Sequence, residues 1–447
     1  MRVPRLRAPR RRAPGLCGAI VALLLVAPAI PTSPAFADDN DTCIRAATPA
    51  AERLTACTRE IESGLRQGAD LAIPYLNRGI AHRVSRDNDD ALADYSEAIR
   101  LDPKNIMAYT GRGGVYLSEG DLERAIADYS AVIEIDPAAA FGFYNRGNAY
   151  ARAHDFDSAI NDFDEALRLD PSFIIPHFGR ASAYAAKGDL DTAIAAYSDA
   201  IAIDPRAADA YNYRGSAFAA KHDYDRAIAD YTEAIRLVPD HALAYYTRGL
   251  AHYAKGDLDR AIADYDDVVR LDPNFVDGYN NRGRAYVAKR DFDRAIADYT
   301  QVIRLDPKLI FAYDNRGLAY YAKRDLDRAI ADFSQAIALD PTYGSAYNNR
   351  GNAYDDAGDH DSAIADYSDA IRLNAMDGEA YYNRGVAYAA KRDFDHAIAD
   401  FNAAIALDPK LAFAYFSRGL ARRAQGDAAA GDADIAKAKE LNPSLGR

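Results

Sequence analysis

The chain has 447 residues, with 67 acidic and 54 basic side chains and a formal net charge of −13 at pH 7. An acidic chain repels phosphate backbones and anionic lipid surfaces. Since no basic stripe is visible, the sequence argues against nucleic-acid and membrane-surface binding. It also contains no G-x-S-x-G, phosphate-binding glycine loop or H-E-x-x-H motif, so we expect a non-catalytic protein without cofactor or metal.

The first 37 residues predict a cleaved signal peptide. Six arginines between Arg2 and Arg12 precede an apolar run from Leu16 to Ile30, and the segment ends in Ala35-Phe36-Ala37. This order is typical of secretory signals, and the apolar run is shorter than the roughly 20 residues of a membrane span. We expect cleavage after Ala37 and a periplasmic or secreted mature chain that is not inserted in the membrane, with a net charge of −19 once the six arginines are lost. Retention of the signal as an anchor stays open.

Residues 38–71 predict a degenerate N-terminal helical cap. The stretch 53–61 aligns with 91–99 of the first regular repeat, which places Cys57 at an aromatic position. Cys43 and Cys57 are the cysteines left after cleavage, and an even pair in an exported chain favours a disulfide. The alternative, free thiols in a metal or redox site, lacks a neighbouring histidine and a C-x-x-C spacing. In the chain-entropy model, closing this loop stabilises the segment by roughly 3 kcal/mol.

From residue 72 to 445 the chain repeats every 34 residues without insertion or deletion. We number eleven repeats from residue 72, and positions 1 to 34 within each repeat. Position 8 is glycine, position 20 alanine, position 24 aromatic and position 32 proline in ten repeats each. Positions 4, 8 and 11 share one helical face, and positions 20, 21, 24, 27 and 28 share another, which predicts two helices per repeat. Such a unit cannot bury its apolar face alone, so the repeats must stack.

This pattern resembles the tetratricopeptide repeat (TPR), of an exported bacterial type, and the resemblance covers residues 72–445. It implies an all-α, right-handed superhelical solenoid of about eleven helix-turn-helix repeats. The eleventh repeat loses the pattern at Arg422, Gly431 and Ile435 and becomes polar, as expected of a C-terminal cap. The resemblance also implies that the first helix of each repeat lines a concave groove, which holds extended peptides or helices.

Three further positions carry charged residues with great regularity. Position 16 is aspartate in every repeat, which predicts an N-cap for the second helix. Position 7 is arginine in all eleven repeats, and position 23 is aspartate in ten, with Ala196 of repeat 4 as the exception. Both depart from the family pattern. We expect the two positions to form an arginine–aspartate ladder along the stack.

Positions 2, 5, 6, 9, 12 and 13 are the predicted groove positions. Position 6 is asparagine in six repeats. Such a row is similar to the asparagine ladder by which some long TPR proteins grip a peptide backbone, since an amide donates and accepts together. The alternative is that these asparagines were copied along with the repeat and only pack its helices together. Aromatic rings and acids on these positions favour a partner with apolar and basic side chains. The predicted peptide-binding residues are Asn145, Asn281, Asn315, Asn349, Asn383, Phe311, Tyr321 and Tyr382.

We therefore expect a scaffold or adaptor that binds a protein or peptide, mainly through repeats 7 to 10. A carboxylate clamp for acidic C-termini, another binding mode of the family, needs lysine or arginine at positions 2 and 5, and no repeat has either. Two alternatives stay open: a self-associating assembly scaffold, and an accessory subunit of a cell-envelope enzyme complex. The sequence does not identify the partner, the pathway or the oligomeric state.

Overall fold

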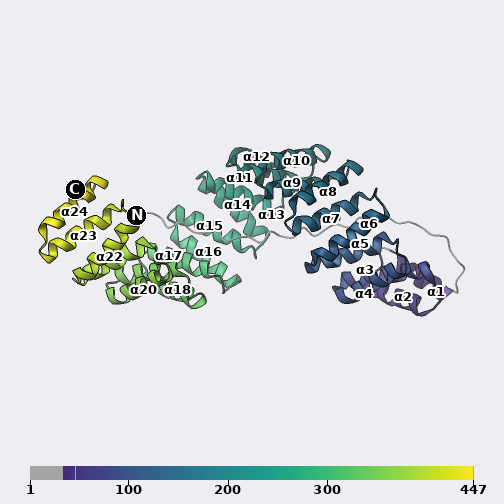
Figure 1. Ribbon diagram of the computed structural model, residues 1–447, viewed down its shortest axis with the longest axis horizontal. Helices are drawn as coiled ribbons and strands as arrows, with labels where there is room; N and C mark the ends of the chain where they lie inside the picture. The colour runs from purple at the N-terminus through teal and green to yellow at the C-terminus, as the bar shows by residue number, and fades with distance from the viewer. Residues whose placement is uncertain (1–33, 46, 446–447) are drawn as a thin grey trace. The chain divides into compact units, whose positions relative to one another are not determined.

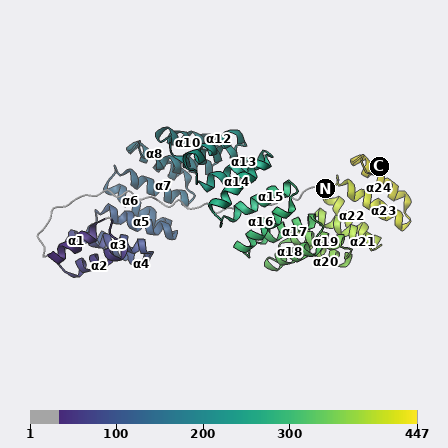
Figure 2. The ribbon, with the colours of Figure 1, turned by 180° about the vertical axis from the view of Figure 1, so that it is seen from behind.

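The computed structural model describes residues 34–45 and 47–445, and every regular element in these ranges is a helix. The all-α class of consecutive helix pairs is thereby confirmed (Figures 1 and 2). Most of the predicted signal peptide lies outside the described residues. The expected cleavage point after Ala37 falls within the first helix and stays a prediction. No helix in the described ranges combines the length and the apolar character of a membrane span.

The chain divides into two compact units, residues 1–196 and 197–447, and the boundary falls within helix α10 (Leu190–Ile203). The described part of the first unit also contains α1 (Pro34–Ile44), α2 (Ala50–Glu62), the short 3-10 helix η1 (Gly68–Leu71), α3 (Ala72–Ser85), α4 (Asn88–Leu101), α5 (Ile106–Glu119), α6 (Leu122–Ile135), α7 (Ala140–Arg152), α8 (Phe156–Leu169) and α9 (Ile175–Ala186).

The second unit contains the helices of repeats 5 to 11. They are α11 (Ala208–Ala220), α12 (Tyr224–Leu237), α13 (Ala242–Ala254), α14 (Leu258–Leu271), α15 (Val276–Ala288), α16 (Phe292–Leu305), α17 (Ile310–Ala322), α18 (Leu326–Leu339), α19 (Gly344–Asp356), α20 (His360–Leu373), α21 (Gly378–Ala390), α22 (Phe394–Leu407), α23 (Ala412–Gln425) and α24 (Ala428–Leu441). Each odd-numbered helix from α3 on is the first helix of a repeat, and the next helix is its second.

Small residues and aromatic rings hold the two helices of a repeat together. In repeat 8, Gly317 of α17 faces the ring of Phe333 on α18, and a β-carbon at Gly317 would lie 2.6 Å from a ring carbon. The ring is fully buried, and Ala329 and Ala353 pack in the same cluster. Since packed interiors leave no room for such an overlap, glycine at position 8 is what lets the aromatic side chain fill the space between the helices.

The turn between the two helices is capped as predicted. In repeat 2, the Asp121 carboxylate accepts the backbone N–H of Arg124 at 3.0 Å, and the same bond opens the second helices of repeats 3 to 11. Asp87 of repeat 1 makes no such bond. The residue before the aspartate has a positive φ. It is glycine in five repeats but arginine or histidine in six: Arg86, His154, His222, Arg290, Arg324 and Arg392.

The predicted arginine–aspartate ladder is present in the structure. In repeat 8, Nε and Nη2 of Arg316 donate to the two carboxylate oxygens of Asp332 at 2.8 and 2.7 Å. Its Nη1 donates to the hydroxyl of Thr300, on the second helix of the preceding repeat, at 3.0 Å. The guanidinium also lies 5.9 Å from the ring centre of Tyr313. One arginine therefore joins three helices from two repeats.

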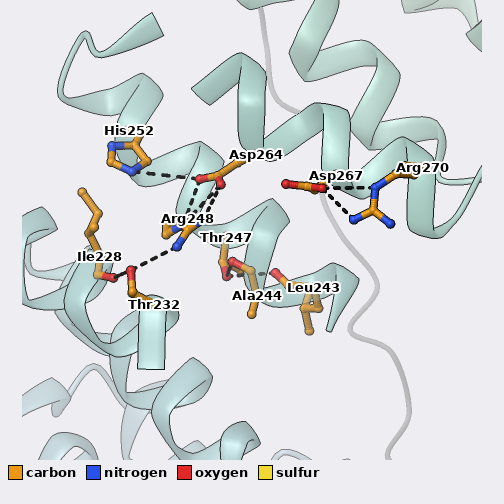
Figure 3. A network of polar contacts seen from close by, with 10 residues as sticks. All are labelled: Ile228, Thr232, Leu243, Ala244, Thr247, Arg248, His252, Asp264, Asp267 and Arg270. Carbon is orange, nitrogen blue, oxygen red and sulfur yellow. Dashed lines mark hydrogen bonds and ion pairs between the residues drawn. The ribbon is translucent and has the colours of Figure 1, made fainter. Parts of the chain in front are cut away.

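The same contacts recur along the chain. Figure 3 shows the version in repeat 6, where Arg248 reaches both Asp264 and Thr232, and His252 lies 4.0 Å from the same carboxylate. Burial raises the pKa of Asp264 even though Arg248 opposes the shift. The bidentate pairs are Arg78–Asp94, Arg112–Asp128, Arg146–Asp162, Arg214–Asp230, Arg248–Asp264, Arg282–Asp298, Arg316–Asp332, Arg350–Asp366, Arg384–Asp400 and Arg418–Asp434.

The N-terminal cap contains the predicted cysteine pair. Cys43 of α1 and Cys57 of α2 are joined, with an S–S distance of 2.13 Å and their Cα atoms 4.9 Å apart. Both residues are buried beside Ala56. Whether the bond forms in the mature protein depends on an oxidising compartment, so the disulfide stays a prediction at this point.

Repeat 4 offers a natural comparison, because it has Ala196 where the other repeats have aspartate. Arg180 donates instead to Asp164, at 3.0 Å, and the side chain of Asp164 is 50% exposed, against 9% for Asp332. Arg316→Leu should therefore destabilise the protein by about 3 kcal/mol, because it leaves the Asp332 carboxylate buried without its cation. Arg180→Leu should cost about 1 kcal/mol or less, because Asp164 stays solvated. Equal shifts of the thermal unfolding midpoint in the two variants would contradict this role of the ladder.

Candidate binding face on the first helices

The predicted binding residues lie on the first helices of the repeats. All but Asn145, which is on α7 in the first unit, belong to α15, α17, α19 and α21 in the second unit. We use the name first-helix face for the side chains at positions 2, 5, 6, 9, 12 and 13 of the first helix of each repeat. Its chemistry depends on which of these side chains are already engaged within the protein.

Positions 5 and 6 of neighbouring repeats are hydrogen-bonded to one another. The position-6 side chain of one repeat donates to the position-5 side chain of the preceding repeat, an arrangement that we call the inter-repeat amide ladder. Its five bonds are Thr247 to Asn212 (2.9 Å), Asn281 to Tyr246 (2.9 Å), Asn315 to Asn280 (3.2 Å), Asn349 to Asp314 (2.9 Å) and Asn383 to Asn348 (3.3 Å). The ladder links repeats 5 to 10 without a break.

The ladder uses the amide donors of the four consecutive asparagines predicted to grip a peptide. Asn281 and Asn315 are buried, and Asn349 and Asn383 are partly buried. The side-chain oxygen of Asn281 is engaged as well, since Arg284 donates to it at 3.0 Å. A peptide backbone would have to compete with these bonds. The structure therefore gives the asparagines a framework role, and their contact with a ligand stays a prediction.

The three predicted aromatic anchors differ in how far they are engaged. Tyr321 donates its hydroxyl to Asp356 at 2.7 Å, and burial together with this carboxylate raises the pKa of Tyr321 to about 12. Tyr382 lies with its ring centre 5.9 Å from that of Phe401, tilted against the core. Phe311 is partly buried on the first turn of α17. All three keep part of their surface exposed on the first-helix face, and so does Asn145 in repeat 3.

The last repeat adds an apolar stripe to this face. Phe413 is 51% exposed and Leu420 is 47% exposed, and the two lie seven residues apart on α23, on one side of the helix. Phe416 lies between them and is partly buried. Leu420 was missed by the sequence analysis, although its spacing from Phe413 was a visible signal. Large exposed apolar side chains on one helical face are typical of interaction surfaces.

Three acids of the face are already paired with a cation. Asp209 accepts a hydrogen bond from His241 at 3.1 Å, which holds the pKa of Asp209 below its usual range. Asp355 is 2.7 Å from a ring nitrogen of His360, and Asp356 forms an ion pair with Arg324. These carboxylates therefore offer a partner less negative charge than their number suggests.

Asp314 of α17 differs from these three acids, because it is buried and its partners are neutral. Only 5% of its surface is exposed. Its Oδ1 accepts the bond from Asn349, its Oδ2 accepts the hydroxyl of Tyr343 at 3.2 Å, and both donors are neutral. Burial raises the pKa of Asp314, and these two hydrogen bonds oppose the shift. In the described part of the chain, no lysine, arginine or histidine forms an ion pair with it.

Other surface features do not form a site. Two depressions of about 310 and 370 Å³ lie at the turns of repeats 7 and 5, lined by residues 289–293 with Lys323 and by residues 221–225 with Lys255. The cations Lys323 and Lys255 are bound there by Asp293 and Asp225. Within residues 34–45 and 47–445, no three histidine, cysteine or acidic side chains are grouped so as to hold a metal ion.

The sequence matches repeat families along most of its length. A tetratricopeptide repeat model matches residues 76–140, 144–208, 178–235, 213–274 and 348–412, which together make up more than half of the chain. A TPR repeat model matches residues 317–358, and a further tetratricopeptide repeat model matches residues 276–309. No curated protein matches the chain.

Several solved structures are similar to parts of the chain. MamA protein is 29% identical over 38% of this chain and 92% of its own, with a TM-score of 0.36. YrrB, described as a TPR protein with an unusual peptide-binding site, is 27% identical over 43% of this chain and 96% of its own, with a TM-score of 0.35. Yeast Tom70 is 17% identical over 84% of this chain and 93% of its own, with a TM-score of 0.40.

The framework role of the asparagines can be tested by comparing two of them. Asn315→Ala should lower the free energy of unfolding by about 1 kcal/mol, because it removes a ladder bond and leaves the buried Asn280 oxygen without its donor. Asn145→Ala should cost less, since Asn145 is only partly buried and makes no side-chain hydrogen bond within the described residues. Denaturant unfolding of both variants measures the difference. Indistinguishable stabilities would show that the ladder does not support the fold.

Asp314→Asn should stabilise the protein at pH 7, on the order of 1 kcal/mol, because the amide removes a buried charge and can still accept the bond from Asn349. A raised pKa in the folded state means that Asp314 costs stability wherever the unfolded chain is ionised, so this cost builds up as the pH rises from the ordinary aspartate pKa towards the folded pKa. The gain should therefore vanish towards pH 4 and below. Thermal unfolding across this pH range measures it. Asp267→Asn is the control: Asp267 is a partly exposed acid paired with Arg270, and its substitution should change little. Destabilisation by Asp314→Asn at pH 7 would contradict the prediction.

Proposed function

We propose that this chain, which belongs to the tetratricopeptide repeat family, is a scaffold that holds a segment of a protein partner against the first-helix face of repeats 7 to 11. Proteins of this family generally mediate protein–protein interactions, and the fold is typically non-catalytic. The observation that carries the proposal is the exposed apolar stripe of Phe413 and Leu420, together with the partly exposed rings on the first helices of repeats 8 and 10. Apolar side chains of this size gain free energy when a partner covers them.

The chemistry of the face indicates the kind of partner. The rings of Phe311 and Tyr382 and the stripe on α23 suit apolar side chains. The acids between them, Asp314 and Glu379 above all, suit basic ones, because neither forms an ion pair within the described residues. We therefore propose an extended or helical segment with apolar and basic side chains as the ligand. The inter-repeat amide ladder keeps the helices that carry these groups in register.

An extracytoplasmic location is part of the proposal. It is supported by the basic start, apolar run and Ala35-Phe36-Ala37 site of the N-terminal segment, and by the pairing of Cys43 with Cys57. N-terminal sequencing of the exported chain tests cleavage after Ala37. Alkylation of its cysteines before and after reduction tests the disulfide. If the disulfide is present, both thiols react only after reduction.

Site-specific photo-crosslinking tests the binding face. A photoreactive residue replaces Ser345, an exposed position-2 residue of α19, in the mature chain expressed in a bacterial periplasm. The matched control carries the same residue at the exposed Arg372, on the second helix of that repeat. We expect a specific crosslinked protein from position 345 and not from position 372. Phe413→Ser with Leu420→Ser should reduce that crosslink at least severalfold, because the two substitutions remove the exposed apolar area without disturbing the core.

Three other outcomes have clear meanings. Equal capture from both positions, or capture unaffected by the double substitution, would contradict binding to the first-helix face. A crosslinked product of two copies of the chain, together with light scattering that rises with concentration, would favour self-association. An enzymatic activity that co-purifies with the chain, and is lost when the captured protein is removed, would favour the accessory-subunit alternative.

A further inference from the structure

Asp314 carries a charge that its place in the inter-repeat ladder does not require. Position 5 is asparagine in repeats 5, 7 and 9. There, Asn212, Asn280 and Asn348 each accept the ladder bond through Oδ1, as Asp314 does in repeat 8. An asparagine at 314 would serve the ladder equally well. Burying a carboxylate instead costs free energy, and a residue that breaks a local rule without a structural gain is a candidate for function.

Among residues 34–45 and 47–445, no cation forms an ion pair with Asp314. Its two hydrogen-bond donors, Asn349 and Tyr343, are neutral. The nearest arginine in the sequence, Arg316, is engaged in the bidentate pair with Asp332. By contrast, Asp355 and Asp356 on the neighbouring helix α19 have His360 and Arg324 as partners. A cation from outside would therefore gain more at Asp314 than at those acids.

The contact with Tyr343 is the one that an incoming cation can replace. Tyr343 lies at the N-cap of α19, ahead of the helix, and is partly buried. Its bond to Asp314, at 3.2 Å, is longer than the usual 2.7–2.8 Å of an O–H···O bond. An N–H of an arginine or lysine side chain in its place would form a charge-assisted bond, which is roughly twice as strong as a neutral one. The bond from Asn349 can remain, because it uses the other carboxylate oxygen.

We propose that Asp314 is the anchor for a basic side chain of the partner, an arginine or lysine that enters from the first-helix face and displaces the hydroxyl of Tyr343. The proposal rests on the function proposed above and makes it more specific: the bound segment carries a basic residue at this point. The neighbouring Phe311, one turn earlier on α17, is placed to contact the apolar part of that side chain or of the residue next to it.

Two peptides that differ only in charge test the proposal. One is a short fluorescein-labelled peptide of alternating leucine and arginine. The other has citrulline, which is neutral and nearly the same shape, in place of each arginine. Wild-type protein should bind the arginine peptide about tenfold more tightly than the citrulline peptide. Asp314→Asn should remove most of this preference and still fold, because asparagine occupies position 5 in three other repeats. Fluorescence anisotropy measures both affinities.

Asp209→Asn is the matched control, since it removes one negative charge from the same face at an acid that is paired with His241. It should keep the preference, and so should Tyr343→Phe, which removes only the displaceable hydroxyl. A preference unchanged in Asp314→Asn, or reduced equally in Asp209→Asn, would overturn the proposal in favour of general attraction to an acidic protein.

The crosslinking experiment separates this inference from the proposed function. If position 345 captures a partner but wild-type protein shows no preference for the arginine peptide, the anchor role of Asp314 is wrong and the binding face stands. If neither experiment shows binding, both the anchor and the proposed function are wrong.

Discussion

The fold depends above all on one contact, the bidentate pair between the arginine at position 7 and the aspartate at position 23. Helix pairs this small bury little apolar area, so their relative position has to be fixed by directional bonds as well as by packing. In repeat 8, Arg316 joins Asp332 and Thr300, and thereby binds its own second helix and that of the repeat before it. Because the arginine is held this way on one side of the first helix, the opposite side keeps the same orientation relative to its own second helix wherever the pair is present.

The binding face follows from that orientation. From repeat 5 to repeat 10, position 6 of one repeat lies within hydrogen-bond distance of position 5 of the repeat before it, and these contacts form the inter-repeat amide ladder. The ladder satisfies amides that would otherwise be buried without partners. Positions 2, 9 and 12 remain beside it, where Phe413, Leu420 and Tyr321 keep exposed surface.

The helix pairs, the aspartate caps and the arginine–aspartate pairs could be predicted because each recurs at a fixed position within one repeat. The ladder between repeats could not. Its donors and acceptors lie 35 residues apart, and their types vary from threonine and asparagine to tyrosine and aspartate, so no single position shows it. The lack of a cation beside Asp314 in the described part of the chain could not be predicted either, because only the structure shows which neighbouring acids have cation partners. The sequence does show that position 5 is aspartate in repeat 8, whereas repeats 7 and 9 have Asn280 and Asn348 there.

The uniformity of the arginine contacts bears on how the length of such a chain can change. Arg214, Arg248, Arg282, Arg316, Arg350, Arg384 and Arg418 present interchangeable groups to the repeat before them, a hydroxyl, amide or carboxylate at position 25 serving as acceptor each time. Loss or duplication of one whole repeat therefore joins two surfaces that already fit. Recombination between copies can lengthen or shorten the binding face in steps of 34 residues, while single residues such as Asp314 distinguish one copy from the next.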